Sequence, residues 1–262
     1  MYEGQRLKNR LAAGDVCFGT WVFSTDPTTT ELLSESGYDF LIIESEHCAW
    51  NIESVQTSIM AAKGADVTIL VRVAWNDAVM MKQVLDAGAG GVVVPLIRNA
   101  DDARRAVAAC MYPPLGLRGF GPRRPSSYGR KGAEYVASAN DNIVVVAQIE
   151  HTDAVDNIDE ILAVPGLTGV LIGRNDLSGS MGILGQTEHP RVVAAIDQVL
   201  AAARRAGGNV GIVSSADPDQ VLKWIEKRMR FITLDCDDAF LLQASQAAVE
   251  RARAIVEKRI VP

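Results

Sequence analysis

Cysteine is scarce in this chain of 262 residues, and the four that occur lie far apart, at Cys17, Cys48, Cys110 and Cys236. No two of them have the C-x-x-C spacing, which argues against a zinc knuckle and against a disulfide framework. Cys48 directly follows His47, but neighbouring residues on an extended chain point in opposite directions, so a Cys–His nucleophile pair is not expected. We therefore interpret all four cysteines as buried structural thiols.

Long apolar runs and an excess of basic residues are also absent. The longest apolar runs have the length of a strand, so no transmembrane helix is expected. The first residues, Met-Tyr-Glu-Gly-Gln-Arg-Leu-Lys, lack the apolar core of a signal peptide, which makes the cytoplasm the default location. The formal net charge of -6 argues against nucleic acid or an anionic membrane as a partner.

Strand-length apolar runs alternate with helix-length segments eight times, and no linker divides the chain, so we expect one domain over residues 1–262. The continuous apolar runs are typical of parallel strands covered on both faces, and eight such units predict an α/β fold of the (β/α)₈ TIM barrel type. The alternative is an open doubly wound sheet, whose dinucleotide-binding form is weakened by the lack of a G-x-G-x-x-G motif after the first strand. The strands are expected at residues 16–22, 40–43, 67–73, 91–94, 142–149, 169–172, 209–213 and 231–234. The helices are expected at residues 26–35, 51–63, 77–87, 101–110, 153–163, 190–206, 217–226 and 239–258.

In such a barrel the functional groups gather where strands end and the following loops begin. Arg72 and Gln148 lie inside otherwise apolar strands, which loop polarity does not explain, and a buried arginine requires an anionic partner. The other side chains at the expected strand ends are Trp21, Glu44, Glu46, His47, Glu150, Asp176, Val213, Ser214 and Ser215.

The two carboxylates Glu150 and Asp176 follow consecutive strands, and neighbouring parallel strands lie about 4.8 Å apart. Both could therefore bind one divalent cation, with water and substrate oxygens completing a site for Mg²⁺ or Mn²⁺. The alternatives are a carboxylate pair that shares a proton, a structural pair with Arg72, or, for Asp176 alone, a turn cap in a glycine-rich loop.

Histidine is the side chain best suited to act as a base near neutral pH, and the chain has three. His47 is favoured because it follows a strand and two acids. His151, which follows Glu150, is the nearest alternative, and His189 is the third. A structural or solvated role remains the alternative for each of them.

Short motifs in a defined order run through nearly the whole chain: residues 19–21, 46–47, 71–72, 75–77, 82–88, 112–119, 148–150, 176–178 and 181–182. On these motifs the chain resembles the HpcH/HpaI aldolase family of metal-dependent class II pyruvate aldolases. The insertion at residues 111–131 is similar to that of a subset described as hydroxy-keto-acid aldolases.

The resemblance implies a barrel whose last helix is exchanged with a neighbour, in a hexamer built of dimers. It also implies a divalent metal (Mg²⁺, Mn²⁺ or Co²⁺) on Glu150 and Asp176. By similarity, Arg72 would polarise the ketone oxygen and stabilise the enolate, and His47, supported by Asp86, would act as the base through a metal-linked water.

The resemblance also implies that Gln148 and the backbone around Gly173 and Asn175 lie near the substrate carboxylate. Trp21 and Val213 are further expected substrate contacts because they lie at the ends of their strands. The implied substrates are small molecules, a 2-oxo acid and an aldehyde.

The implied activity is the reversible cleavage of 4-hydroxy-2-oxo acids to pyruvate, or a close 2-oxo acid, and an aldehyde through a metal-stabilised enolate. No lysine ends any expected strand, which argues against a Schiff-base route. The alternatives are a CoA-ester lyase of the citryl or malyl type and a non-catalytic barrel that binds a 2-oxo acid.

Two features depart from or extend the family pattern. Arg174 stands where the family usually has proline, and it would contact a second carboxylate or point to solvent. Arg123 and Arg124 in the insertion would bind an acidic substrate tail, contact a neighbouring subunit, or form a solvated basic loop.

Overall fold

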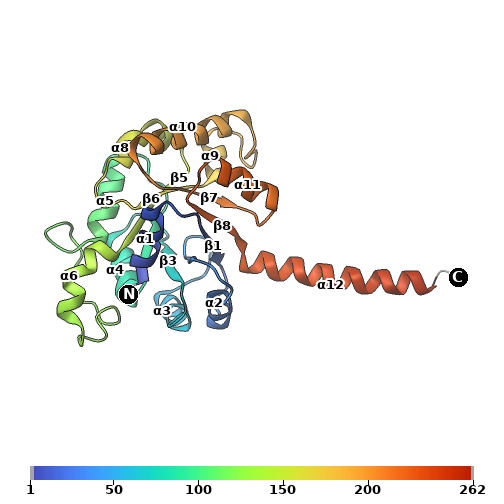
Figure 1. The fold of residues 1–262 in the computed structure, drawn as a ribbon, viewed down its shortest axis with the longest axis horizontal. Coiled ribbons are helices and arrows are strands. Elements are labelled where there is room, and N and C mark those ends of the chain that lie inside the picture. The colour runs from blue at the N-terminus through green and yellow to red at the C-terminus, as the bar shows by residue number, and fades with distance from the viewer. Residues whose placement is uncertain (1–2, 261–262) are drawn as a thin grey trace.

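The computed structural model describes residues 3–260, in which eight parallel strands close into a barrel (Figure 1). Each strand pairs with the next along the chain, and β8 pairs with β1 to complete the closure. This arrangement confirms the predicted (β/α)₈ barrel and excludes the open doubly wound sheet. The strands are β1 (Cys17–Val22), β2 (Phe40–Glu44), β3 (Thr68–Arg72), β4 (Gly91–Val94), β5 (Val144–Ile149), β6 (Gly169–Ile172), β7 (Val210–Ser214) and β8 (Phe231–Cys236).

Helices surround the barrel, and most of them lie where the sequence predicts them (Figure 1). The exceptions are α1, α6 and α9, which were not expected, and residues 153–163, which form the two short helices α7 and α8. The helices are α1 (Glu3–Ala13), α2 (Pro27–Ser34), α3 (Ile52–Ala61), α4 (Ala78–Ala87), α5 (Ala100–Cys110), α6 (Gly132–Asn142), α7 (Thr152–Asp156), α8 (Ile158–Leu162), α9 (Arg174–Ser180), α10 (Pro190–Ala206), α11 (Pro218–Glu226) and α12 (Asp237–Ile260).

Short-range signals explain where several helices begin and end. The Asp26 carboxylate accepts a hydrogen bond from the Thr28 backbone N–H, and Pro27 occupies the first helical position of α2, as the sequence indicates. Asp77 caps α4 in the same way. This helix ends at Gly88, whose φ of 110° suits glycine far better than residues with a side chain.

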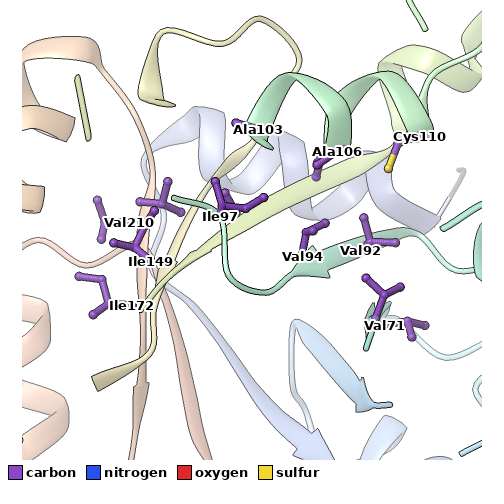
Figure 2. Packing of buried hydrophobic residues seen from close by; sticks show 14 of the residues in the cluster. Val71, Val92, Val94, Ile97, Ala103, Ala106, Cys110, Ile149, Ile172 and Val210 are labelled. Atoms are coloured by element: carbon purple, nitrogen blue, oxygen red, sulfur yellow. The ribbon is translucent and has the colours of Figure 1, made fainter. Parts of the chain in front are cut away.

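The core has two layers because successive residues of a strand point to opposite sides of the barrel wall. Val93 of β4 belongs to the cluster inside the barrel. Its neighbours Val92 and Val94 point outward, and Figure 2 shows them near Ala106 and Cys110 of α5. Full burial of each such side chain stabilises the fold by about 1.5–3 kcal/mol.

The last helix, α12, projects away from the barrel (Figure 1). Several of its apolar side chains are exposed, among them Leu241, Leu242 and Val249. The exchange of this helix with a neighbouring chain stays a prediction.

All four cysteines are free thiols, but only Cys17 and Cys110 are buried. Cys48 and Cys236 are half-buried, so the expectation of four buried thiols is wrong for these two. The physical reason is their position, since Cys48 follows β2 and Cys236 ends β8, both at the open rim of the barrel. Within residues 3–260, no helix is both long enough and apolar enough to cross a bilayer.

Candidate active site

Arg72 ends β3 in register with Glu44 at the end of β2, and its side chain is almost completely buried, with 9 % of the residue exposed. Its guanidinium forms an ion pair with the Glu44 carboxylate through Nη2 and donates a hydrogen bond to it from Nε. The Nε atom also lies 3.2 Å from Oε2 of Glu46, and the guanidinium carbon lies 4.6 Å from the ring centroid of Trp21. The prediction that a buried arginine requires an anionic partner is therefore confirmed. The partners are Glu44 and Glu46, whereas the alternative considered from the sequence was a structural pair with Glu150 or Asp176.

Glu44 organises the loop that follows β2, a role that the sequence analysis did not assign. The residue is fully buried, and its Oε1 accepts hydrogen bonds from the backbone N–H groups of Glu46 at 2.7 Å and His47 at 2.9 Å. Its other oxygen, Oε2, binds Arg72. A single carboxylate therefore positions the cation and the backbone of the histidine-bearing loop together. This role could have been predicted from the sequence, because Glu44 is an acid at the end of one strand and Arg72 is the unusual arginine in the next strand.

His47 lies at the open rim, with 66 % of its side chain exposed, and its Nε2 is 3.8 Å from Oε2 of Glu46. The two other histidines have structural roles. His151 and His189 precede α7 and α10, and the Nδ1 of each accepts a hydrogen bond from the backbone N–H two residues later, in Asp153 and Arg191. These caps favour His47 over His151 as a base.

Asp86 does not lie near His47 within one chain. It is near the end of α4, just before the loop that enters β4, and its carboxylate accepts a hydrogen bond from Nη2 of Arg118 at 2.6 Å. Because α4 runs back along the barrel from the carboxyl end of β3, Asp86 lies at the opposite end from His47. The support for His47 that the resemblance implies is therefore not made within the described chain.

Glu150 follows β5 and is buried. Its Oε1 accepts a hydrogen bond from the backbone N–H of Leu96 at 2.7 Å, and its Oε2 accepts one from Nε2 of Gln148. Burial is the main cause that raises the pKa of Glu150, and the negative charge of Asp176 raises it further. The two carboxylates are thus near enough to repel one another, as the sequence analysis expects for the ends of β5 and β6.

Asp176 lies in the first turn of the short helix α9, a segment in which no helix was expected and for which a glycine-rich loop was one alternative. The serines of this segment close the helical turns, since Ser178 Oγ donates to the backbone oxygen of Asn175 at 2.6 Å. Gly173 precedes the helix and allows the close approach of Glu150, because a Cβ at this position would lie 3.0 Å from Glu150 Oε2.

The remaining expected substrate contacts differ in character. Trp21 is buried, and its Nε1 donates to Thr233 Oγ1 at 3.0 Å, so its ring orients Arg72 and offers little surface to a ligand. Val213 is half-buried near the end of β7, and Asn175 is exposed on α9. Gln148 lies between Arg72 and Glu150. Its Oε1 accepts a hydrogen bond from Arg72 Nη1 at 3.5 Å, and its Nε2 donates one to Glu150 Oε2.

The structure shows the contacts of Arg174 and of the two arginines in the insertion. Arg174 Nη1 lies 3.0 Å from Glu188 Oε1, and its guanidinium carbon is 5.3 Å from the ring centroid of Trp224, so it contacts a second carboxylate. Arg123 is exposed, whereas Arg124 Nε donates to the backbone oxygen of Ala87 at 2.7 Å.

A cluster of at least three His, Cys, Asp or Glu side chains placed to hold a metal ion does not occur among the side chains that the structure describes, residues 4–256. The pair formed by Glu150 and Asp176 is therefore the candidate set of protein oxygen ligands. Glu46 is the neighbouring acid, and its pKa is raised by burial and further by the negative charge of Glu150. Oε2 of Glu46 is buried and has no hydrogen-bond partner among the described residues, because its contact with Arg72 lacks hydrogen-bond geometry.

The chain is similar over nearly its whole length to proteins of one family. The family model described as HpcH/HpaI aldolase/citrate lyase matches residues 17–244. A 4-hydroxy-2-oxo-heptane-1,7-dioate aldolase of Salmonella paratyphi C is 38% identical over 256 residues, which cover 97% of this chain and 96% of the relative.

Two solved structures have the same fold over nearly all of their length. The HpcH/HpaI aldolase of Desulfitobacterium hafniense DCB-2 has a TM-score of 0.89 at 35% identity, and the match covers 95% of this chain and 97% of that one. The citrate synthase SbnG has a TM-score of 0.87 at 29% identity, and the match covers 97% and 99%.

Proposed function

Because the chain belongs to the HpcH/HpaI aldolase/citrate lyase family, we propose that it is a divalent-metal-dependent aldolase. Its reaction would be the reversible cleavage of 4-hydroxy-2-oxo acids to pyruvate, or a close 2-oxo acid, and an aldehyde. The observation that carries the proposal is a buried arginine, Arg72, held rigidly beside Glu150 at the end of the barrel where such enzymes bind their substrates.

Arg72 supplies a fixed positive charge where an enolate oxygen would develop. Glu44 and the ring of Trp21 hold the guanidinium in place, so little reorganisation is needed when negative charge forms beside it. The contact of the guanidinium with Gln148 at 3.5 Å is long, so Nη1 can exchange this weak hydrogen bond for one to a substrate oxygen.

The chemistry of Glu150 and Asp176 fits a hard divalent cation such as Mg²⁺, Mn²⁺ or Co²⁺. Burial and the neighbouring negative charge both disfavour the ionised form of Glu150, and a cation held by Glu150 and Asp176 would offset both effects. Gly173 leaves space beside the Glu150 carboxylate that a side chain would fill. When bound, the cation would supply Lewis-acid stabilisation of the charge that develops on the ketone oxygen.

His47 is the residue that would remove a proton from the carbon next to the ketone, with a water molecule as the relay. It is exposed at the rim, and Glu46 lies 3.8 Å from its Nε2. Because Asp86 lies at the far end of the barrel, its expected support for His47 would require a neighbouring chain.

The proposal includes a homo-hexamer with exchanged last helices. The exposed Leu241 and Leu242 of α12 support it, since they offer apolar surface to a neighbouring chain. Light scattering on purified protein measures the mass of the assembly, and a monomer at micromolar concentration would contradict this part of the proposal.

Deuterium exchange at the methyl group of pyruvate, followed by NMR, tests the activity without knowledge of the aldehyde. We expect exchange with Mg²⁺ or Mn²⁺, loss of exchange after EDTA, and loss in Glu150→Gln. The control is Asp153→Asn, which removes a nearby exposed carboxylate outside the site and should keep the wild-type rate. Full exchange by metal-stripped Glu150→Gln would contradict the mechanism.

The alternative within the same family is a CoA-ester lyase, which the citrate lyase members of the family favour. This enzyme would use a thioester in place of pyruvate. A folded protein that exchanges no pyruvate protons with any metal would support this alternative or a barrel that binds a 2-oxo acid without turnover.

A further inference from the structure

A cavity of about 370 Å³ opens at the end of the barrel opposite the candidate active site. Gly90 and Ile143, which directly precede β4 and β5, both line it. Glu150 and Asp176, by contrast, follow the carboxyl ends of β5 and β6. The cavity is therefore a separate feature, formed where α1, α6 and the ends of α3 and α4 converge.

Positive charge predominates in the wall of this cavity. Lys63, Arg124 and Lys131 line it, and Glu134 is the acidic residue among its lining side chains. Among the side chains that the structure describes, those of residues 4–256, none of these four forms an ion pair. Several cations elsewhere on the surface are paired with carboxylates, as Arg104 is with Asp101 at 2.6 Å. Unpaired like charges around one concave space raise the local positive potential, which a bound anion would lower.

Arg124 is held in position within the wall. Its Nε donates to the backbone oxygen of Ala87 at the end of α4, and its guanidinium has no other hydrogen-bond partner among the described residues. Gly88 allows this approach, because a Cβ at that position would lie 3.3 Å from Arg124 Nε. The terminal nitrogens of an ordered guanidinium thus remain available to a carboxylate or phosphate.

The cavity also has an apolar part, to which Leu85 and the buried Tyr135 contribute. Its volume is in the range of sites that bind small molecules. A wall with three cations and an apolar portion suits an organic molecule that carries several negative charges on a small carbon frame.

We propose that this cavity is a second binding site, for a small multivalent organic anion that bears at least two phosphate or carboxylate groups. Lys63 and Lys131 contribute long-range attraction, and Arg124 contributes the directed hydrogen bonds. The ligand would connect α3, α4 and α6 and would stabilise the folded protein through its binding free energy.

Isothermal titration calorimetry on the full chain, in low salt and without added metal, tests the proposal with pyrophosphate and with tricarballylate as probes. The test variants are Lys63→Glu and Lys131→Ala, which spare the helix contact of Arg124. The matched control is Arg204→Glu, an exposed cation on α10 away from the cavity. Acetate serves as the monovalent control.

We expect at least one probe to bind the wild type with a Kd below about 1 mM. Lys63→Glu should weaken binding at least about tenfold and Lys131→Ala by a smaller factor, with Arg204→Glu within about twofold of wild type. Binding of pyrophosphate alone would identify a phosphate ligand, and binding of tricarballylate alone a polycarboxylate. Absence of binding by both probes at 10 mM (about ten times the expected upper limit), or equal weakening in Arg204→Glu, would overturn the proposal.

Discussion

Replacing Arg72 with Met should destabilise the folded protein by about 3–5 kcal/mol at neutral pH, the usual cost of leaving a buried charge without its partner. The fully buried Glu44 and the largely buried Glu46 both lose their counter-charge in this variant. The cation–π contact with Trp21 is lost as well, which adds about 1 kcal/mol. Pyruvate exchange should be lost together with this stability.

The destabilisation should depend on pH in a defined direction. Burial raises the pKa of Glu46, and the charge of Arg72 lowers it. Without Arg72 the pKa in the folded state should therefore rise further above its unfolded value. An acid with a raised pKa in the folded state binds its proton more tightly there, so stability falls as pH rises from the unfolded pKa through the folded one. Arg72→Met should consequently be closer to wild type at pH 5 than at pH 8.

Urea unfolding followed by circular dichroism at both pH values measures the effect, and thermal unfolding gives an independent value. For a chain of this size each kcal/mol corresponds to roughly 2–4 °C, so the combined loss of about 4–6 kcal/mol should lower Tm by roughly 8–24 °C at pH 8. The control is the double variant Glu44→Gln/Arg72→Met. The side-chain amide oxygen that Glu44→Gln introduces can still accept the two backbone hydrogen bonds while the buried charge is removed, so stability should recover in part and activity should not. A single variant as stable as wild type at pH 8 would refute this reasoning.

Two further predictions concern the thiols and the barrel wall. Burial raises the pKa of Cys17 to about 11 and that of Cys110 to about 12, so at pH 8 only about one molecule in a thousand or fewer carries either thiolate. Intact-mass spectrometry should show that iodoacetamide spares both until the protein unfolds, and rapid labelling of either in the native protein would contradict this. Gly91→Ala should destabilise by about 1–3 kcal/mol or more, because its Cβ would lie 2.2 Å from the Val144 backbone oxygen. Gly132→Ala has open space at the start of α6 and should be neutral or stabilising by up to about 1 kcal/mol, and thermal unfolding compares the two.

The fold could be predicted from the sequence because its signals are local. The apolar runs that become β4 and β6 stop within a residue of their expected ends, and Asp26, Pro27 and Gly88 mark helix boundaries through contacts a few residues away. Helix α9 was missed because its turns depend on serine hydroxyls that bond back to the chain, within a segment whose glycines favour a loop.

The site could be predicted only in part. Arg72 was conspicuous in an apolar strand, and the demand for an anionic partner followed from the physics of burial alone. Which acid would satisfy it depended on the register between β2 and β3, which places Glu44 opposite Arg72. The capping roles of His151 and His189 likewise depended on where the helices begin.

The sequence by itself determined the alternation of strands and helices, the buried cation and the acids at the strand ends, because each depends on residue type and short spacing. Only the tertiary structure decided that Asp86 lies at the opposite end of the barrel from His47. It alone also brought Lys63, Arg124 and Lys131 around one cavity. The physical reason is that barrel closure and helix packing set the distances between residues far apart in the chain, and these distances arise from the summed packing of many side chains.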